Sequence, residues 1–92
     1  MVPSKHSRLI PLRAFVYIIG TRTKAGWQTY VGWTYDLEQR LAAHNRGHGA
    51  RSTRGRQWKL LYAEPYSDKA SAMSREWYLK RDRKFRRLVL PA

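Results

Sequence analysis

The 92-residue sequence contains no cysteine, so neither a disulfide framework nor a thiolate zinc site is available. No apolar run approaches the roughly 18 residues needed to cross a bilayer. The N-terminus also lacks the apolar core of a signal peptide. The three histidines, His6, His44 and His48, are scattered and do not make a convincing metal cage. We therefore expect a cytoplasmic protein with no membrane partner.

Acidic residues are scarce: 6 Asp and Glu stand against 19 Lys and Arg, which gives a formal net charge of +13. This balance predicts a polyanionic partner, with nucleic acid ahead of an acidic membrane surface. The cations cluster rather than alternate with acids, which argues against a merely solubilising surface. Four Trp, six Tyr and two Phe supply the bulk for one modest core. We expect a basic flexible arm over residues 1–13 and a single domain over residues 14–90.

The hydrophobic pattern predicts three strands, over residues 14–19, 27–33 and 58–64, the last ended by Pro65. The first two strands are expected to be antiparallel, with Gly32 opening a cleft beside Tyr30. A helix is predicted to follow the second strand, and another to begin after Ser67 or Asp68, with basic helical sequence continuing over 81–90. This order of elements predicts a small α+β domain with a short, mainly antiparallel sheet. The apolar residues of the last helical region are expected to pack: Ala70, Met73, Trp77, Phe85, Leu88 and Val89.

The helix after the second strand is amphipathic in an unusual way. Asp36 is placed to cap its first turn, and Gly47 is free to adopt the left-handed conformation that ends helices. Leu37, Arg40, Leu41 and His44 share one face, because they are spaced at i, i+3, i+4 and i+7. Two of the four positions that should be apolar therefore carry a cation and an imidazole.

Five polar residues occupy positions where the pattern favours apolar ones: Tyr17, Tyr30, Arg40, His44 and Glu76. Each has an ordinary explanation taken singly. The tyrosines can be core aromatics, Arg40 can extend to the surface, and His44 can sit favourably at the negative end of the helix dipole. Glu76 can form an i,i+4 ion pair with Lys80, worth only about 0.3–0.5 kcal/mol.

Taken together, the five residues supply the parts for phosphodiester hydrolysis. Glu76 stands on the flank of an apolar stripe, where a carboxylate is costly unless it is paired or metal-bound. Mg²⁺ is often held by one carboxylate together with water and substrate phosphate. An arginine for the phosphoryl charge, with a histidine and tyrosines for proton transfer, completes such a set.

A Gly-punctuated loop without any acid, residues 48–57, is typical of a phosphate-binding surface, since arginine offers a fork of donors. Such contacts give affinity and salt dependence but little choice of sequence. Trp33, Trp58 and Trp77 are expected to pack in the core more readily than to stack on unpaired bases. The residues predicted to bind nucleic acid are Arg46, Arg51, Arg54, Arg56, Lys59, Lys80, Arg81 and Lys84.

Five blocks in order carry a family resemblance: Phe15-Val16-Tyr17, Tyr30-Val31-Gly32, and the segments DLEQRLAAHN, GHGARSTR and REWYLK. They resemble the GIY-YIG nuclease superfamily, and in particular its small stand-alone bacterial branch, which is related to the nuclease domain of a structure-specific endonuclease. The likeness covers residues 14–85. It implies a three-stranded antiparallel sheet flanked by helices.

The resemblance also implies a one-metal hydrolysis of DNA, structure-dependent or weakly specific, in DNA repair or recombination. Glu76 would bind Mg²⁺ or Mn²⁺, and Arg40 would stabilise the phosphoryl charge. Tyr17, Tyr30 and His44 would position and deprotonate the water. Any of these three is open as the general base: a tyrosine needs its pKa lowered, for instance by Arg40, whereas His44 needs no shift. A non-catalytic nucleic-acid-binding module is the alternative function, and RNA remains open beside DNA.

Overall fold

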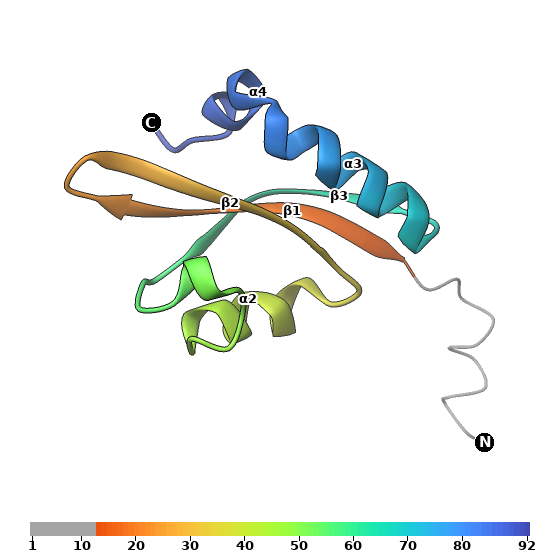
Figure 1. Cartoon of the computed structure of the whole chain (residues 1–92), viewed down its shortest axis with the longest axis horizontal. Helices are drawn as coiled ribbons and strands as arrows, with labels where there is room; N and C mark the ends of the chain where they lie inside the picture. The colour runs from red at the N-terminus through yellow and green to blue at the C-terminus, as the bar shows by residue number, and fades with distance from the viewer. Residues whose placement is uncertain (1–12) are drawn as a thin grey trace.

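The computed structural model describes residues 13–92, so the predicted arm, apart from Arg13, lies outside the described residues. The order of the main elements is strand, strand, helix, strand, helix, helix, as the sequence predicted (Figure 1). A short 3₁₀ turn, η1, is inserted before the third strand. The elements are β1 Ala14–Thr23, β2 Gly26–Thr34, α2 Leu37–Asn45, η1 Arg51–Thr53, β3 Lys59–Tyr66, α3 Lys69–Arg81 and α4 Arg83–Leu88.

The three strands form one antiparallel sheet in the order β2-β1-β3, which confirms the predicted α+β fold. The β1–β2 hairpin is longer than predicted, because Thr21 to Thr23 pair with Gln28 to Gly26 instead of forming a loop. β3 is also longer, since Pro65 lies within it, opposite Phe15. Proline is tolerated there because β3 is an edge strand, where a missing backbone N–H need not break a ladder.

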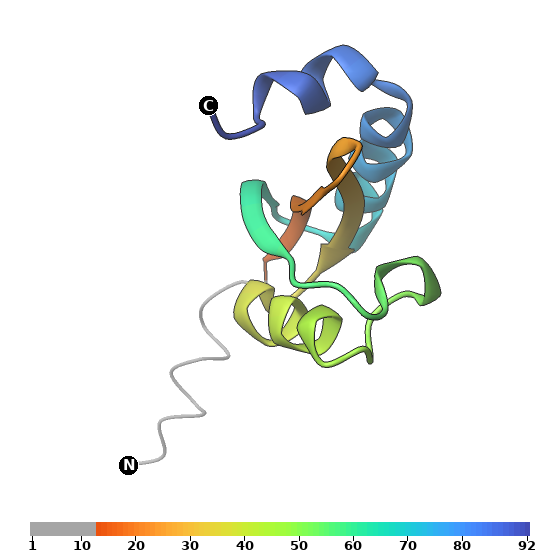
Figure 2. The ribbon, with the colours of Figure 1, turned by 90° about the vertical axis from the view of Figure 1, so that its left-hand side faces the viewer.

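Helices cover both faces of the sheet. Figure 2 shows α2 below the sheet and α3 with α4 above it. Alternate residues of β1 supply the two cores. Val16 and Ile18 pack with Ala72 and Leu79 of α3, whereas Tyr17 and Ile19 pack with Trp58 and the α2 side.

The apolar stripe predicted for α3 is wrong. Ala72 and Leu79 are the buried residues of this helix, whereas Met73 is 44% and Trp77 51% exposed. The small side chain of Ala72 lets the helix approach the sheet closely, and Leu79, two turns later, continues that face. Leu88, 77% exposed, does not pack either, but Phe85 and Val89 do.

Aspartates cap the helices. The side chain of Asp36 accepts a hydrogen bond from the backbone N–H of Gln39 at 3.0 Å, and Asp68 accepts one from Ser71 at 2.7 Å. Asp82 caps α4 by accepting from Phe85 at 2.9 Å. The predicted helix end is also confirmed, since Gly47 follows α2 with φ +81°. Within residues 13–92, no helix is long and apolar enough to span a membrane.

Candidate active site

A buried hydrogen-bond chain joins β1, α2 and the loop after α2. The Tyr17 hydroxyl lies 2.7 Å from Nε2 of His44. On the other side of the ring, Nδ1 of His44 lies 2.8 Å from Oγ1 of Thr53. The hydroxyl of Thr53 in turn donates to the carbonyl oxygen of Ala50 at 2.9 Å. His44 and Thr53 are both fully buried, so each polar atom of the chain depends on the others for its hydrogen bonds.

The hydrogen-bond chain fixes the tautomer of His44. A hydroxyl has one hydrogen, and that of Thr53 is used on the Ala50 carbonyl, which can only accept. Oγ1 of Thr53 must therefore accept from His44, which places the ring proton on Nδ1. Nε2 of the neutral ring is then left as an acceptor for the Tyr17 hydroxyl. His44 is thus positioned to take a proton from Tyr17.

Two glycines make room for these side chains. A Cβ added to Gly32 would lie 2.6 Å from Cζ of Tyr17, so the space beside β2 is filled by the phenol and the predicted cleft there is wrong. A Cβ on Gly49 would lie 2.7 Å from both Cγ and Cε1 of His44. Neither glycine has a positive φ, so close approach, not backbone conformation, requires them.

The loop that carries Thr53 is held by Asn45 and Trp58. The amide of Asn45 donates to the carbonyl of Trp58 at 3.0 Å and accepts from its N–H at 2.6 Å. The indole N–H of Trp58 donates to the Thr53 carbonyl at 2.8 Å. Trp58 is buried against Tyr17 and Ile19, so the preference for core packing over base stacking is confirmed for this residue.

Tyr30 and Arg40 complete the group on the α2 face of the sheet. The ring of Tyr30 lies 5.1 Å from that of His44 and 6.5 Å from that of Tyr17. Arg40 projects from α2, and its buried Nε has no hydrogen-bond partner among the described residues. A buried cationic donor without a partner is costly. This donor set is suited to an anionic ligand.

Burial is the main influence on the pKa values of Tyr17 and His44. It raises the pKa of Tyr17 above 10.0, and Arg40 only partly opposes this. Arg40 thus acts on the pKa of Tyr17 in the direction that the sequence indicated, but burial outweighs it. Burial, helped by the positive charge of Arg40, lowers the pKa of His44 below 6.5. At neutral pH Tyr17 is a phenol and His44 a neutral imidazole, which suits donation from the first to the second.

Within residues 13–92, Glu76 makes no hydrogen bond to this group. It lies on α3, which packs on the opposite face of the sheet from α2 (Figure 1). Its side chain is 19% exposed and forms the i,i+4 ion pair with Lys80 that the sequence allowed, at 3.6 Å. Glu76 is close enough to Tyr17 for its charge to favour the neutral phenol, as the weakest of several effects on that pKa. No group of three or more His, Cys, Asp or Glu side chains is placed for a metal among residues 13–92.

All eight predicted nucleic-acid-binding cations are exposed. Three of them already make contacts within the protein. Arg56 donates to Gln28, Lys80 pairs with Glu76, and the guanidinium of Arg81 lies 3.6 Å from the ring centroid of Trp77. The others are Arg46, Arg51, Arg54, Lys59 and Lys84.

A second carboxylate, Glu64, was given no role by the sequence. It receives hydrogen bonds from Tyr62, from Tyr66 at 2.7 Å and from Nε of Arg75 at 2.5 Å. Burial alone would raise the pKa of Glu64, but these donors together lower it below its ordinary value. Both carboxylate oxygens have partners, so the role of Glu64 is to join β3 to α3.

Sequence reasoning also missed Thr53, Gly49 and Asn45. Their signals were weak: a threonine and a glycine in a cationic loop, and an asparagine in the last position of a helix. Thr53 and Asn45 contact residues 9 and 13 positions away in the sequence, His44 and Trp58, and Gly49 lies against the ring of His44. A buried histidine needs partners for both ring nitrogens, and that requirement was the only signal that could have singled out Thr53.

Comparison with known proteins shows the family of the chain. The family model described as the GIY-YIG catalytic domain matches residues 13–88. The chain belongs to the GIY-YIG family. Members of this family are endonucleases that act on DNA and generally use divalent metals.

Several bacterial relatives are of similar size. The chain is 46% identical over 68 residues to UPF0213 protein CPE1444 of Clostridium perfringens, covering 73% of this chain and 70% of the relative. It is 41% identical over 73 residues to a UPF0213 protein of Streptococcus pneumoniae, covering 78% and 71%. The solution NMR structure of UPF0213 protein BH0048 from Bacillus halodurans is 35% identical, covers 84% of this chain and 82% of its own, and has a TM-score of 0.46. The names of these relatives state no substrate.

Proposed function

We propose that this protein is a metal-dependent endonuclease that hydrolyses phosphodiester bonds in DNA, with structure-dependent or weak specificity, in DNA repair or recombination. The observation that carries the proposal is the buried chain from Tyr17 through His44 to Thr53. A neutral imidazole held in one tautomer, with Nε2 facing a tyrosine hydroxyl, can accept a proton from it.

The hydrogen bonds between Tyr17, His44 and Thr53 support a specific proton path. The Tyr17 oxygen takes a proton from the attacking water while the Tyr17 proton passes to Nε2 of His44. The hydroxide so formed attacks phosphorus while the P–O bond to the leaving oxygen breaks. The imidazolium holds the proton received from Tyr17, and the leaving oxygen is protonated from solvent. His44 is thus the final base and Tyr17 the group that touches the water. Tyr30, beside both rings, orients the water.

Arg40 is proposed to bind the phosphoryl oxygens. Its Nε is a buried donor without a partner among residues 13–92, and charge developing on phosphate in the transition state would supply one. A planar guanidinium with two parallel donors suits two phosphate oxygens. Lysine at this position would keep the charge but lose the fork.

Glu76 is the residue proposed to hold Mg²⁺ or Mn²⁺. A lone carboxylate fits an ion that keeps most of its water and takes its other ligands from the substrate phosphate. Such an ion would supply charge for the scissile phosphate and the leaving oxygen. The ion pair with Lys80 is long at 3.6 Å, and the Lys80 side chain is 49% exposed. Such an i,i+4 pair contributes only about 0.3–0.5 kcal/mol, so it can break. Lys80 is then free to contact the DNA backbone.

The proposed DNA surface comprises the eight exposed cations. Counterion release predicts that the logarithm of affinity falls linearly with the logarithm of salt concentration, with a slope of about −0.9 for each phosphate contacted. Arg51 and Arg54 lie in and beside η1, on the loop that also carries Thr53. Phosphate binding by Arg51 and Arg54 would therefore bring the DNA backbone close to the hydrogen-bond chain from Tyr17 to Thr53.

The test is cleavage of labelled flap, four-way, duplex and single-stranded DNA with Mg²⁺ or Mn²⁺. Wild type is compared with Glu76→Gln, which removes the metal-binding charge, and with Tyr17→Phe, which keeps the ring but removes the hydroxyl. We expect both variants to bind DNA as wild type does and to lose cleavage at least about 100-fold. Cleavage that persists in Tyr17→Phe would refute the proton path.

A non-catalytic nucleic-acid-binding module is the second candidate, and the formed Glu76–Lys80 ion pair favours it. If the pair is the whole purpose of Glu76, Glu76→Gln changes binding slightly and neither wild type nor the variant cuts. Retained, salt-sensitive binding to DNA or RNA by both proteins, with no metal-dependent product, would establish the binding module.

A further inference from the structure

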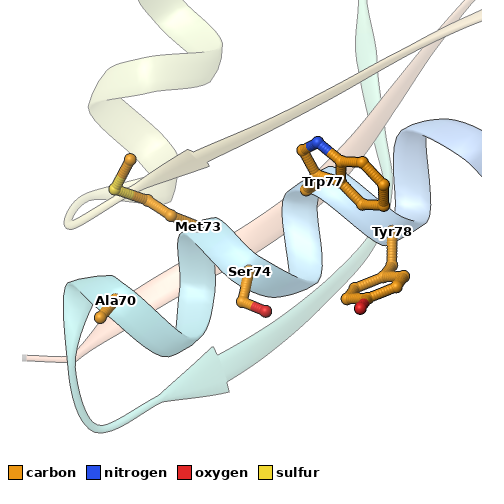
Figure 3. A pocket seen from close by; sticks show the side chains of 5 residues that line it. All are labelled: Ala70, Met73, Ser74, Trp77 and Tyr78. Atoms are coloured by element: carbon orange, nitrogen blue, oxygen red, sulfur yellow. The ribbon is translucent and has the colours of Figure 1, made fainter.

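The α3 surface next to the proposed metal ligand carries aromatic side chains that the core does not use. Trp77 is 51% and Tyr78 62% exposed, and their rings are 5.0 Å apart, edge to face. With Ala70, Met73 and Ser74 they line a hollow of about 570 Å³. Figure 3 shows Met73 and Trp77 projecting from one side of α3 and Tyr78 from the other. The volume falls in the range of small-ligand sites, about 300–1,000 Å³.

One side of the Trp77 ring is held by a cation. The guanidinium of Arg81 lies 3.6 Å from the ring centroid and also donates to the carbonyl of Trp77 at 2.7 Å. This arrangement restrains the indole, and with Arg81 in place half of Trp77 is still exposed. A restrained aromatic surface beside a cation is suited to a flat, electron-rich ligand attached to a negative charge.

Helix geometry links this surface to Glu76. At about 100° per residue, Lys80, Met73 and Trp77 lie about 40°, 60° and 100° around α3 from Glu76, all in the same direction. Glu76 lies at the margin of the buried face of α3, and Trp77 lies farther from that face, toward solvent. A nucleic-acid strand with one phosphate at Glu76 would therefore run past Lys80, and its neighbouring nucleotide would lie near Trp77.

We propose that Trp77, Tyr78 and Arg81 form a stacking site for an unpaired base of the nucleic-acid substrate. The inference rests on the proposed nucleic-acid partner. Charge complementarity selects this occupant: the guanidinium of Arg81 lies against the Trp77 ring, Lys80 is on the same helix, and the protein has a net charge of +13. Bases in a blunt duplex are stacked on one another and cannot reach the indole, so the site favours single strands, flaps and junctions.

The test compares binding without metal, so that no cutting is needed. The ligands are a fluorescent single-stranded oligonucleotide, an abasic strand of equal length and charge, and a blunt duplex. Wild type is compared with Trp77→Ala and with the control Leu88→Ala, which removes an even more exposed apolar side chain from α4. We expect Trp77→Ala to bind the oligonucleotide roughly 5- to 100-fold more weakly, as loss of one stacked base predicts. Its binding to the abasic strand and the duplex should be unchanged.

Three outcomes would overturn the stacking site. Trp77→Ala could bind the oligonucleotide as wild type does, or it could lose affinity for all three ligands equally. Alternatively, wild type could self-associate at the concentrations used while Trp77→Ala stays monomeric, which would assign the surface to a second copy of the chain. Failure of the nuclease proposal is distinguishable, because Glu76→Gln would then show the same base-dependent binding and no protein would cut.

Discussion

Replacing Gly49 by alanine tests the packing around His44 directly. The new methyl would lie 2.7 Å from two ring carbons of His44 and still closer to Nδ1. The ring cannot move aside freely, because Tyr17 and Thr53 hold its two nitrogens. Overpacking of this kind costs about 1–3 kcal/mol. Rotation of the ring out of the clash gives up buried hydrogen bonds at a similar cost. We expect the free energy of unfolding to fall by about 1–3 kcal/mol, measured by urea denaturation.

The control is the same substitution in a His44→Ala background. With the imidazole gone, the methyl meets no ring, and Gly49 has no positive φ that alanine would strain. Gly→Ala then lowers the entropy of the unfolded chain, which stabilises by about 0.4–1 kcal/mol. The sign of the effect should therefore reverse between the two backgrounds, a coupling of at least about 1 kcal/mol. An equal loss of stability in both backgrounds would refute the account.

Three further substitutions or conditions have clear expectations. Thr53→Val should destabilise the fold by about 1–3 kcal/mol, since it leaves the Nδ1–H of His44 buried and unpaired. Thr53→Ser, which keeps the hydroxyl, should restore most of this stability. Equal ¹⁵N shifts of the His44 ring in wild type and Thr53→Val would contradict the tautomer assignment. Leu79→Ala, at a fully buried site, should cost about 2–5 kcal/mol in urea denaturation, whereas Leu88→Ala should stay within about 0.5 kcal/mol; similar losses would refute the assignment of the buried face. Because the pKa of His44 is lowered in the fold, the unfolded state binds more protons than the folded state as the pH falls below about 6.5. Stability should therefore decrease with falling pH in that range. A His44→Gln variant whose thermal midpoint has the same pH slope as that of wild type would contradict this.

The sequence predicted the order of elements because the signals were local. Val16 and Ile18 in an apolar run, Asp36 before an amphipathic stretch and Gly47 after it each act through neighbours in the chain. The unusual polar face of α2 was also predicted, since Arg40 and His44 occupy positions whose spacing alone marks them as inward.

The buried face of α3 was not predictable in the same way. Apolar residues occur all round this helix, and the larger ones, Met73 and Trp77, dominated the pattern. The fold instead used Ala72, because a small side chain allows close packing on the sheet. The choice between two apolar faces is made by tertiary contacts, which periodicity cannot rank.

The partners of His44 were likewise outside local reasoning. Thr53 and Gly49 surround the ring only because a loop returns over the end of α2, held by Asn45 and Trp58. The pKa of Tyr17 depends on the same packing: Arg40 lowers it, as the sequence suggested, but burial outweighs that charge. The extent of burial is a property of the folded chain, so the sequence could not rank the two effects.

Cleavage of labelled flap and four-way DNA by wild type and Glu76→Gln, with and without Mg²⁺ or Mn²⁺, tests the central claim most directly. The account predicts metal-dependent products from wild type and none from the variant, with equal DNA binding by the two. Binding by both proteins without products under either metal would contradict it.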